Sequence, residues 1–280
     1  MAGYLRPNNL DEALSALDAA PRMIVAGGTD YYPARVGRPL DDDVLDVTAL
    51  AGLRDIVETD HYWRIGALVT WTDVIRAALP PLFDGLKLAA REIGGAQVQN
   101  AGTLAGNICN ASPAADGMPV LLVLDAEIDL ASVAGARKIP LADFVTGNRK
   151  TELRGNELVT GIRVPKPSGA SNSTFLKFGA RKYLVISIVM VGATLETSLD
   201  GTVSRARVTV GACSEVARRL DDLEASLIGQ PVSPALGDMV AARHLASLTP
   251  IADIRGGADF RIDAALTLVR RALIDLGSKS

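Results

Sequence analysis

Two short segments rich in small residues carry the most chemistry in this chain. They span residues 24–30 and residues 100–116. Glycine and alanine leave backbone N–H groups uncovered, and a nest of such groups binds anions. Hydroxyl and amide side chains within both segments can add hydrogen bonds. Two such loops that face each other could hold a diphosphate without a lysine-rich phosphate loop, so the sequence predicts a dinucleotide site.

The first segment directly follows a short apolar run, residues 23–25, that is typical of a buried strand. Glycines at this place allow positive φ and a close approach of the backbone to a ligand. The segment matches neither the Rossmann fingerprint nor the Walker loop. Taken alone, it is explained equally well by an ordinary Gly-Gly turn.

The second segment reads as a long polar loop that leads into a helix over residues 113–124, with Ser112 as its cap. A long polar loop within a compact domain is usually functional or disordered, and the capped helix argues against disorder. Asp116 could accept a hydrogen bond from a ribose or ribityl hydroxyl. Compensation of the helix dipole explains Asp116 at least as well.

Outside these segments the candidate residues are isolated. Lys177 lies on an expected strand and could direct a cation toward a cofactor, although a solvated lysine is the commoner case. His61 and His244 have no cysteine or carboxylate at metal-ligand spacing, so we expect no metal site. Ser112 and Ser187 lack the context of a nucleophile elbow, so we expect no catalytic residue.

The composition excludes several classes of protein. The chain has 280 residues, 48% of them apolar, which indicates a globular protein of two or three subdomains. Its net charge of −3 and lack of a basic stripe argue against nucleic-acid binding. There is neither an apolar run long enough to span a bilayer nor a signal peptide at the start. Cys109 and Cys213 are far apart, which fits the cytoplasm, and they are too few to hold an iron–sulfur cluster.

The pattern of elements predicts an α+β fold, because helices and strands do not alternate regularly. Residues 165–173 are the best linker candidate, and Asp200-Gly201 is a strong hairpin turn. Strands are expected over residues 23–25, 44–47, 127–130, 158–164, 174–178, 186–197 and 203–213, and in a hairpin over residues 54–67. Helices are expected over residues 10–19, 70–78, 81–93, 113–124, 217–228, 236–248 and 262–276.

The two segments together resemble a known family. Ala26-Gly27-Gly28-Thr29-Asp30 is similar to the motif A-G-G-T/H-D/S. Thr103-Leu104-Ala105-Gly106-Asn107 and the following Ala111-Ser112-Pro113-Ala114-Ala115-Asp116 are similar to T-I-G-G-N and A-S-P-x-x-D. In this order and spacing they resemble the FAD-binding (medium) subunit of the molybdenum hydroxylase family. That family includes xanthine dehydrogenase and bacterial carbon monoxide dehydrogenase, and the resemblance covers essentially the whole chain.

The resemblance implies a two-lobed FAD-binding domain of the p-cresol methylhydroxylase type and a small C-terminal domain of sheet and helices. The first domain would span residues 1–167, with lobes of about 1–55 and 56–167. The C-terminal flavoprotein domain would span residues 172–280, and the flavin would lie between the two domains.

The resemblance also assigns cofactor-binding residues. The diphosphate would bind to Ile24, Val25, Ala26, Gly27, Gly28, Thr29 and Asp30, and to Thr103, Leu104, Ala105, Gly106 and Asn107. Asp116 would hold the ribityl or ribose region, and Ile93 and Val159 would pack near the adenine. Lys177 would approach the flavin or its diphosphate, and Ile186 would lie against the isoalloxazine. Ala105 departs from the usual glycine, so a methyl group projects where backbone usually approaches the cofactor.

The function implied is that of an electron-transfer subunit. A large partner subunit would carry molybdopterin and hydroxylate the substrate, and a small partner would carry [2Fe-2S] clusters. Electrons would pass from those clusters to FAD in this chain and then to an external acceptor such as NAD, oxygen or a quinone. The alternatives are a stand-alone nucleotide-binding module without a redox role and an independent FAD oxidoreductase.

Overall fold

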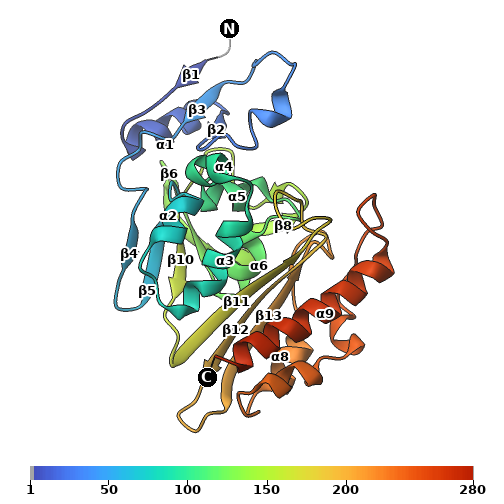
Figure 1. The fold of residues 1–280 in the computed structure, drawn as a ribbon. Helices are drawn as coiled ribbons and strands as arrows, with labels where there is room; N and C mark the ends of the chain where they lie inside the picture. The colour runs from blue at the N-terminus through green and yellow to red at the C-terminus, as the bar shows by residue number, and fades with distance from the viewer. Residues whose placement is uncertain (1–2, 280) are drawn as a thin grey trace.

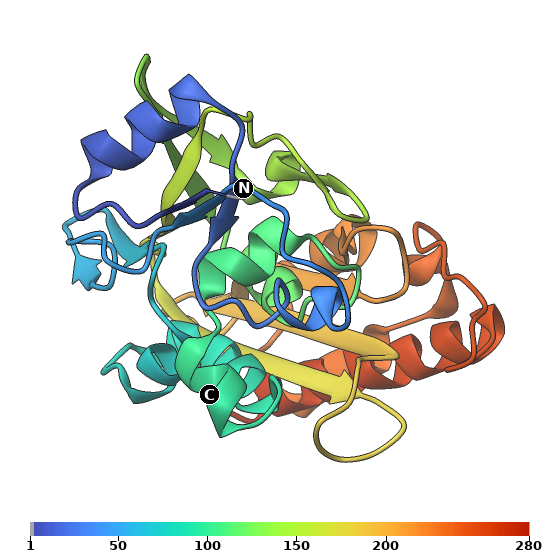
Figure 2. The same cartoon turned by 90° about the horizontal axis from the view of Figure 1, so that it is seen from above.

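Three larger β-sheets follow one another along the chain, a small two-stranded sheet accompanies the second, and helices pack around them (Figure 1). The computed structural model describes residues 3–279. The strands and helices are mixed without regular alternation, so the α+β class predicted from the sequence is confirmed. The blue N-terminal segments and the red C-terminal helix lie on opposite sides of the molecule in both views (Figures 1 and 2).

The first sheet is parallel and has the strand order β1-β3-β2. Its strands are β1 (Tyr4–Leu5), β2 (Met23–Val25) and β3 (Val44–Asp46). Helix α1 (Leu10–Ala19) begins where the side chain of Asn9 accepts a hydrogen bond from the amide of Glu12, a regular N-cap. The buried face of α1 packs with Leu45 of β3 in one small core. Strand β2 ends at the first glycine-rich segment.

The second sheet is antiparallel and has the order β4-β5-β10-β6-β7. Its strands are β4 (Ile56–Glu58), β5 (Tyr62–Gly66), β6 (Glu127–Ser132), β7 (Gly135–Pro140) and β10 (Leu158–Pro165). The helices between these strands are α2 (Trp71–Arg76), α3 (Asp84–Glu92), α4 (Ala96–Ala101), α5 (Leu104–Asn110), α6 (Gly117–Val123) and α7 (Leu141–Phe144). A two-stranded hairpin of β8 (Val145–Gly147) and β9 (Lys150–Thr151) follows α7. All seven residues of α6 are buried, so this helix forms the centre of the largest core.

The third sheet has the order β11-β12-β13-β14. Its strands are β11 (Ala170–Phe178), β12 (Val189–Thr197), β13 (Val203–Gly211) and β14 (Arg218–Arg219). Helices α8 (Asp221–Leu227) and α9 (Ala258–Gly277), with 3-10 turns at Pro234–Met239 and Ala242–Leu245, enclose a second core. A methyl group at Gly192 of β12 would clash with the backbone of Pro119, so α6 packs directly on the opposite face.

Strand β11 joins the two cores. Phe175 belongs to the core around α6, and its neighbour Leu176 packs against the core under α9. The Ser173 hydroxyl accepts a hydrogen bond from the Gly85 amide of α3, at 2.8 Å. The Thr174 hydroxyl donates to Asp275 of α9, at 2.6 Å. The strand is therefore held from both sides, although the sequence predicted part of it as linker.

Several sequence-based boundaries were wrong. Residues 100–116 were expected to form a long loop, but α5 occupies much of this segment. The helix expected from residue 113 begins only at Gly117. The helix expected over residues 236–248 is replaced by the two 3-10 turns, because leucine spacing alone does not distinguish the two kinds of helix. Within residues 3–279, no helix is both long and apolar enough to cross a membrane.

Candidate functional site

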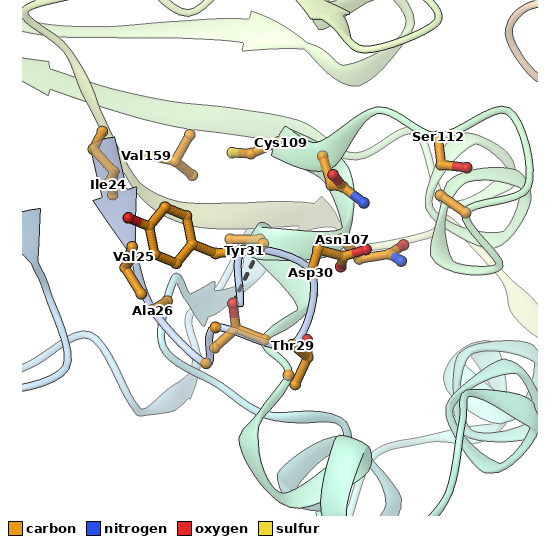
Figure 3. A pocket seen from close by; sticks show the side chains of 18 of the residues that line it. Ile24, Val25, Ala26, Thr29, Asp30, Tyr31, Asn107, Cys109, Ser112 and Val159 are labelled. Carbon is orange, nitrogen blue, oxygen red and sulfur yellow. Dashed lines mark hydrogen bonds between the residues drawn. The ribbon is translucent and has the colours of Figure 1, made fainter. Parts of the chain in front are cut away.

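A single cavity of about 1150 Å³ brings together most of the predicted site residues (Figure 3). Its wall includes the end of β2 and the turn after it, the amino end of α5, the region before α6 and the end of β11. The loop between β11 and β12, residues 179–188, also contributes and stands out from the body of the molecule in Figure 2. Of the seventeen residues predicted from the sequence, Leu104 alone is absent from this wall; its side chain is fully buried in the core.

The first glycine-rich segment forms a tight turn over the end of α4. A Cβ atom at Gly27 would overlap the carbonyl oxygen of Ala101, so only glycine fits there. Gly28 adopts a φ of +66°, which glycine tolerates best. In the described part of the chain, the amides of Gly27, Gly28, Thr29 and Asp30 donate to no acceptor. The turn therefore offers a row of free N–H groups beside the cavity.

The second segment faces this turn from the start of α5. Thr103 is the N-cap of the helix, and its hydroxyl accepts a hydrogen bond from the amide of Gly106 at 3.0 Å. The Leu104 amide donates to the carbonyl of Val69 at 3.0 Å, which fixes the helix start against the neighbouring loop. Ala105 lines the cavity with a side chain that is 5% exposed. Among the described residues, the Ala105 amide has no acceptor.

Asn107 completes this part of the wall. Its side-chain oxygen accepts a hydrogen bond from the amide of Gly117 at 3.3 Å. The side chain thus ties α5 to the start of α6 and keeps its own amide nitrogen beside the cavity. Asn107, Asp30 and Thr29 lie around the same space in Figure 3.

A buried charged cluster forms another part of the cavity wall. Lys177 Nζ lies 2.6 Å from Asp116 Oδ2, and both side chains are only 7% exposed. The Ser187 hydroxyl donates to the other oxygen of Asp116. Burial raises the pKa of Asp116, whereas the ion pair with Lys177 and the hydrogen bond from Ser187 oppose that rise. The sequence singled out Asp116 and Lys177 separately but not their pairing.

The aliphatic residues line different parts of the cavity. Val159 of β10 lies beside Ile24 of β2 (Figure 3). Ile93 follows Glu92, whose carbonyl accepts a weak hydrogen bond from Lys177 at 3.4 Å. Ile93 therefore lies near the charged cluster, whereas Val159 lies near Ile24. Ile186, on the loop after β11, is 54% exposed at the edge of the cavity.

Tyr31 also lines the cavity, although it was not among the residues predicted from the sequence. Its ring lies among Ile24, Val25 and Val159 in Figure 3. The only sequence signal for it is its position directly after the first motif. Cys109 also lines the cavity, and burial raises the pKa of its thiol to about 12. A thiol with so high a pKa is almost wholly protonated near neutral pH and is therefore a poor nucleophile.

The residues present fit FAD. The free amides of the two facing segments can accept a diphosphate, since a row of backbone N–H groups binds anions without added positive charge. Aliphatic and aromatic side chains on either side of these amides can contact two flat ring systems. The cavity volume also slightly exceeds the roughly 300–1,000 Å³ of ordinary small-molecule pockets. Within residues 3–279, no group of acidic, histidine or cysteine side chains could hold a metal ion.

Comparisons with known proteins agree with this chemistry. A family model described as the FAD binding domain in molybdopterin dehydrogenase matches residues 1–167. A second model, the CO dehydrogenase flavoprotein C-terminal domain, matches residues 174–276.

Individual relatives match over nearly their whole length. The 6-hydroxypseudooxynicotine dehydrogenase complex subunit alpha of Paenarthrobacter nicotinovorans is 32% identical over 96% of this chain and 92% of its own. The nicotine 6-hydroxylase medium subunit of the same organism is 28% identical, over 99% and 98%. The solved structure of carbon monoxide dehydrogenase from Hydrogenophaga pseudoflava superposes with a TM-score of 0.87 at 27% identity, covering 99% of this chain and 97% of that one.

Proposed function

The chain belongs to the FAD-binding family of the molybdopterin dehydrogenases, and we propose that it binds FAD in this cavity as the electron-transfer subunit of a molybdenum hydroxylase. The observation that carries this proposal is the pair of facing segments with free backbone amides between the aliphatic residues and the charged cluster. The alternative of a nucleotide-binding module without a redox role does not fit membership of an oxidoreductase family.

We assign the diphosphate to the middle of the cavity. The amides of Gly27, Gly28, Thr29 and Asp30 would donate to one side of it, and the start of α5 at Ala105 to the other. Neither segment carries a lysine or an arginine, so the diphosphate would be held by the oriented dipoles of the backbone amides. The methyl group of Ala105 would touch the cofactor at the position where the motif T-I-G-G-N has glycine.

The redox-active ring belongs beside Lys177 and Asp116. Bound FAD supplies the redox chemistry, and the protein supplies position and electrostatics. Ile93 and Ile186 would contact the isoalloxazine, while the Lys177 ammonium, fixed by Asp116, would set the local potential. Ile24 and Val159 would then face the adenine. No protein acid or base is assigned to the reaction.

The partners follow from the same function. We propose that a small subunit with [2Fe-2S] clusters delivers electrons to FAD here, and that a large subunit with molybdopterin hydroxylates the substrate. This proposal is supported by relatives named as a medium subunit and as a subunit of a dehydrogenase complex. Electrons would leave to an external acceptor. The two free cysteines support an assignment to the cytoplasm.

The visible absorption spectrum of the purified chain tests the proposal. We expect flavin bands nearly stoichiometric with protein and release of FAD rather than FMN on denaturation. Affinity purification of the tagged chain from its source should bring down subunits that contain molybdenum and iron. A colourless chain that fails to take up added FAD, alone or with its partners, would refute the assignment.

A further inference from the structure

Tyr31 is part of a small cluster at the cavity wall that none of the assigned roles uses. It is the first residue after the free amides of the glycine turn, and its ring lies among Ile24, Val25 and Val159 (Figure 3). Arg35 lines the same cavity. Aromatic side chains provide a flat surface on which bases stack.

The ring of Tyr31 is held in place before any ligand binds. Its hydroxyl donates to Asp42 Oδ2 at 3.0 Å. The guanidinium of Arg35 lies over the ring, with Cζ at 3.9 Å from the centroid, and donates to the same carboxylate at 2.7 Å. Arg35 also donates to the Tyr31 carbonyl at 3.2 Å. A ring fixed in this way loses little conformational entropy on binding, so its contacts contribute more fully to affinity.

The position of the ring identifies the half of the dinucleotide that it meets. The two ring systems of FAD lie on either side of the diphosphate, which the free amides would hold. The ion pair of Lys177 and Asp116 suits the redox-active ring, because protein charge near a flavin tunes its electronics. Tyr31 groups instead with Ile24 and Val159, where the adenine is expected.

We propose that Tyr31, held by Arg35 and Asp42, contacts the adenine of FAD and selects FAD over FMN. The inference rests on the proposed function, since it requires FAD in this cavity. FMN lacks the adenosine half and would leave the ring without a partner. The cluster therefore acts on the choice of cofactor and not on the redox step.

The experiment compares FAD and FMN binding by the full chain after its flavin has been removed. Quenching of flavin fluorescence gives both dissociation constants for the wild type and for Tyr31→Leu. Because base–aromatic stacking contributes measurably for each base, we expect Tyr31→Leu to weaken FAD binding about tenfold and to leave FMN binding within about twofold. Tyr31→Phe keeps the ring and should retain most of the preference for FAD.

The matched control is Tyr183→Leu. Tyr183 is 61% exposed on the loop after β11 and does not line the cavity, so the ratio of the two dissociation constants should not change. Circular dichroism and the melting temperature show whether each variant is folded. If Tyr31→Leu is not folded, Tyr31→Met, which also removes the ring, takes its place with the same expected result. The inference is overturned if Tyr31→Leu binds FAD as tightly as the wild type. It is also overturned if Tyr31→Leu binds FAD more tightly, because the ring would then occupy the space of the adenine. If the wild type binds neither flavin, the proposed function itself fails.

Discussion

The glycine turn (residues 27–30) and the charged cluster (Lys177, Asp116 and Ser187) line the same cavity, one with backbone groups and the other with side chains. Residues 27–30 present backbone amides that donate to no acceptor among the described residues. Asp116 and the distant residues Lys177 and Ser187 present side chains, which interact with one another. Adding side-chain atoms should therefore disturb the glycine turn most, whereas removing a charge should disturb the charged cluster most. A cofactor with a diphosphate and a redox-active ring needs both kinds of surface.

The largest effect is expected from adding one methyl group to the turn. In Gly27→Ala the new Cβ overlaps the carbonyl oxygen of Ala101, so the turn must move away from α4. We expect a loss of about 4–5 kcal/mol in unfolding free energy, at the severe end for single substitutions, and no retained flavin. Urea unfolding and the ratio of visible to ultraviolet absorbance measure the two effects. The control is Gly257→Ala, where the Cβ meets nothing within 4 Å; a normal flavin content in Gly27→Ala would contradict the backbone-built site.

The next largest effect is expected from breaking the buried ion pair. Lys177→Met leaves the Asp116 carboxylate buried without its cation, which should cost about 3–4 kcal/mol. The double variant Lys177→Met, Asp116→Leu should recover much of this loss, because no charge then remains buried. The exposed pair of Lys138 and Glu127 provides the control, since Lys138→Met should change the unfolding free energy by about 0–1 kcal/mol. If Lys177→Met lowers the unfolding free energy no more than Lys138→Met does, the buried ion pair does not stabilise the fold.

A smaller effect with a pH signature is expected from Ser187→Ala. The substitution removes one donor from the buried Asp116 carboxylate and should cost about 1–2 kcal/mol. Because burial holds the pKa of Asp116 above its unfolded value, the native state binds this proton more tightly than the unfolded state. Stability therefore falls as the pH rises from the ordinary aspartate range through the raised pKa.

The missing hydrogen bond should raise the pKa of Asp116 further in Ser187→Ala, so the fall in stability should extend to higher pH. Unfolding free energies measured from about pH 4 to 7 for the wild type, Ser187→Ala and Asp116→Asn test this, and Asp116→Asn should lack the fall. An identical pH profile for the wild type and Ser187→Ala would show that the hydroxyl does not act on the carboxylate.

The smallest effect is expected at Cys109, which lies in the cavity wall but belongs to neither site. Burial raises the pKa of this thiol to about 12 and that of Cys213 to about 11. Both thiols should resist alkylation in the native protein near neutral pH and react only after unfolding. Mass spectrometry of the alkylated chain measures this. Rapid alkylation of Cys109 in the folded protein would mean that the cavity wall around this thiol moves enough to expose it.

The local geometry of the glycine turn was predictable from sequence, and the pairing within the charged cluster was not. A strand followed by Ala26, Gly27 and Gly28 is a local pattern, and local patterns predict local geometry. Lys177 and Ser187 lie 61 and 71 residues from Asp116, so only the fold brings them together. Nothing in the spacing of these residues indicates their pairing.

The same distinction explains the errors in secondary structure. Residues 104–110 look like a loop because glycine and asparagine are weak helix formers. They form α5 because Thr103 caps the helix and because Leu104 and Ile108 enter the core, which is a tertiary effect. Strand β11 was predicted only in part, because its first residues read as a linker. The alternation of Phe175 and Leu176 between two cores becomes visible only in the structure.

The position of β11 in both cores has a consequence for the cooperativity of the molecule. Ser173 is bonded to α3 and Thr174 to α9, so separating the two cores would break both bonds and uncover apolar surface on each side. The chain should therefore melt in one transition, and a fragment that ends before β11 would expose the face of α6 and aggregate. Flavin exchange would then proceed through local movement of the loop after β11, without a hinge between the halves.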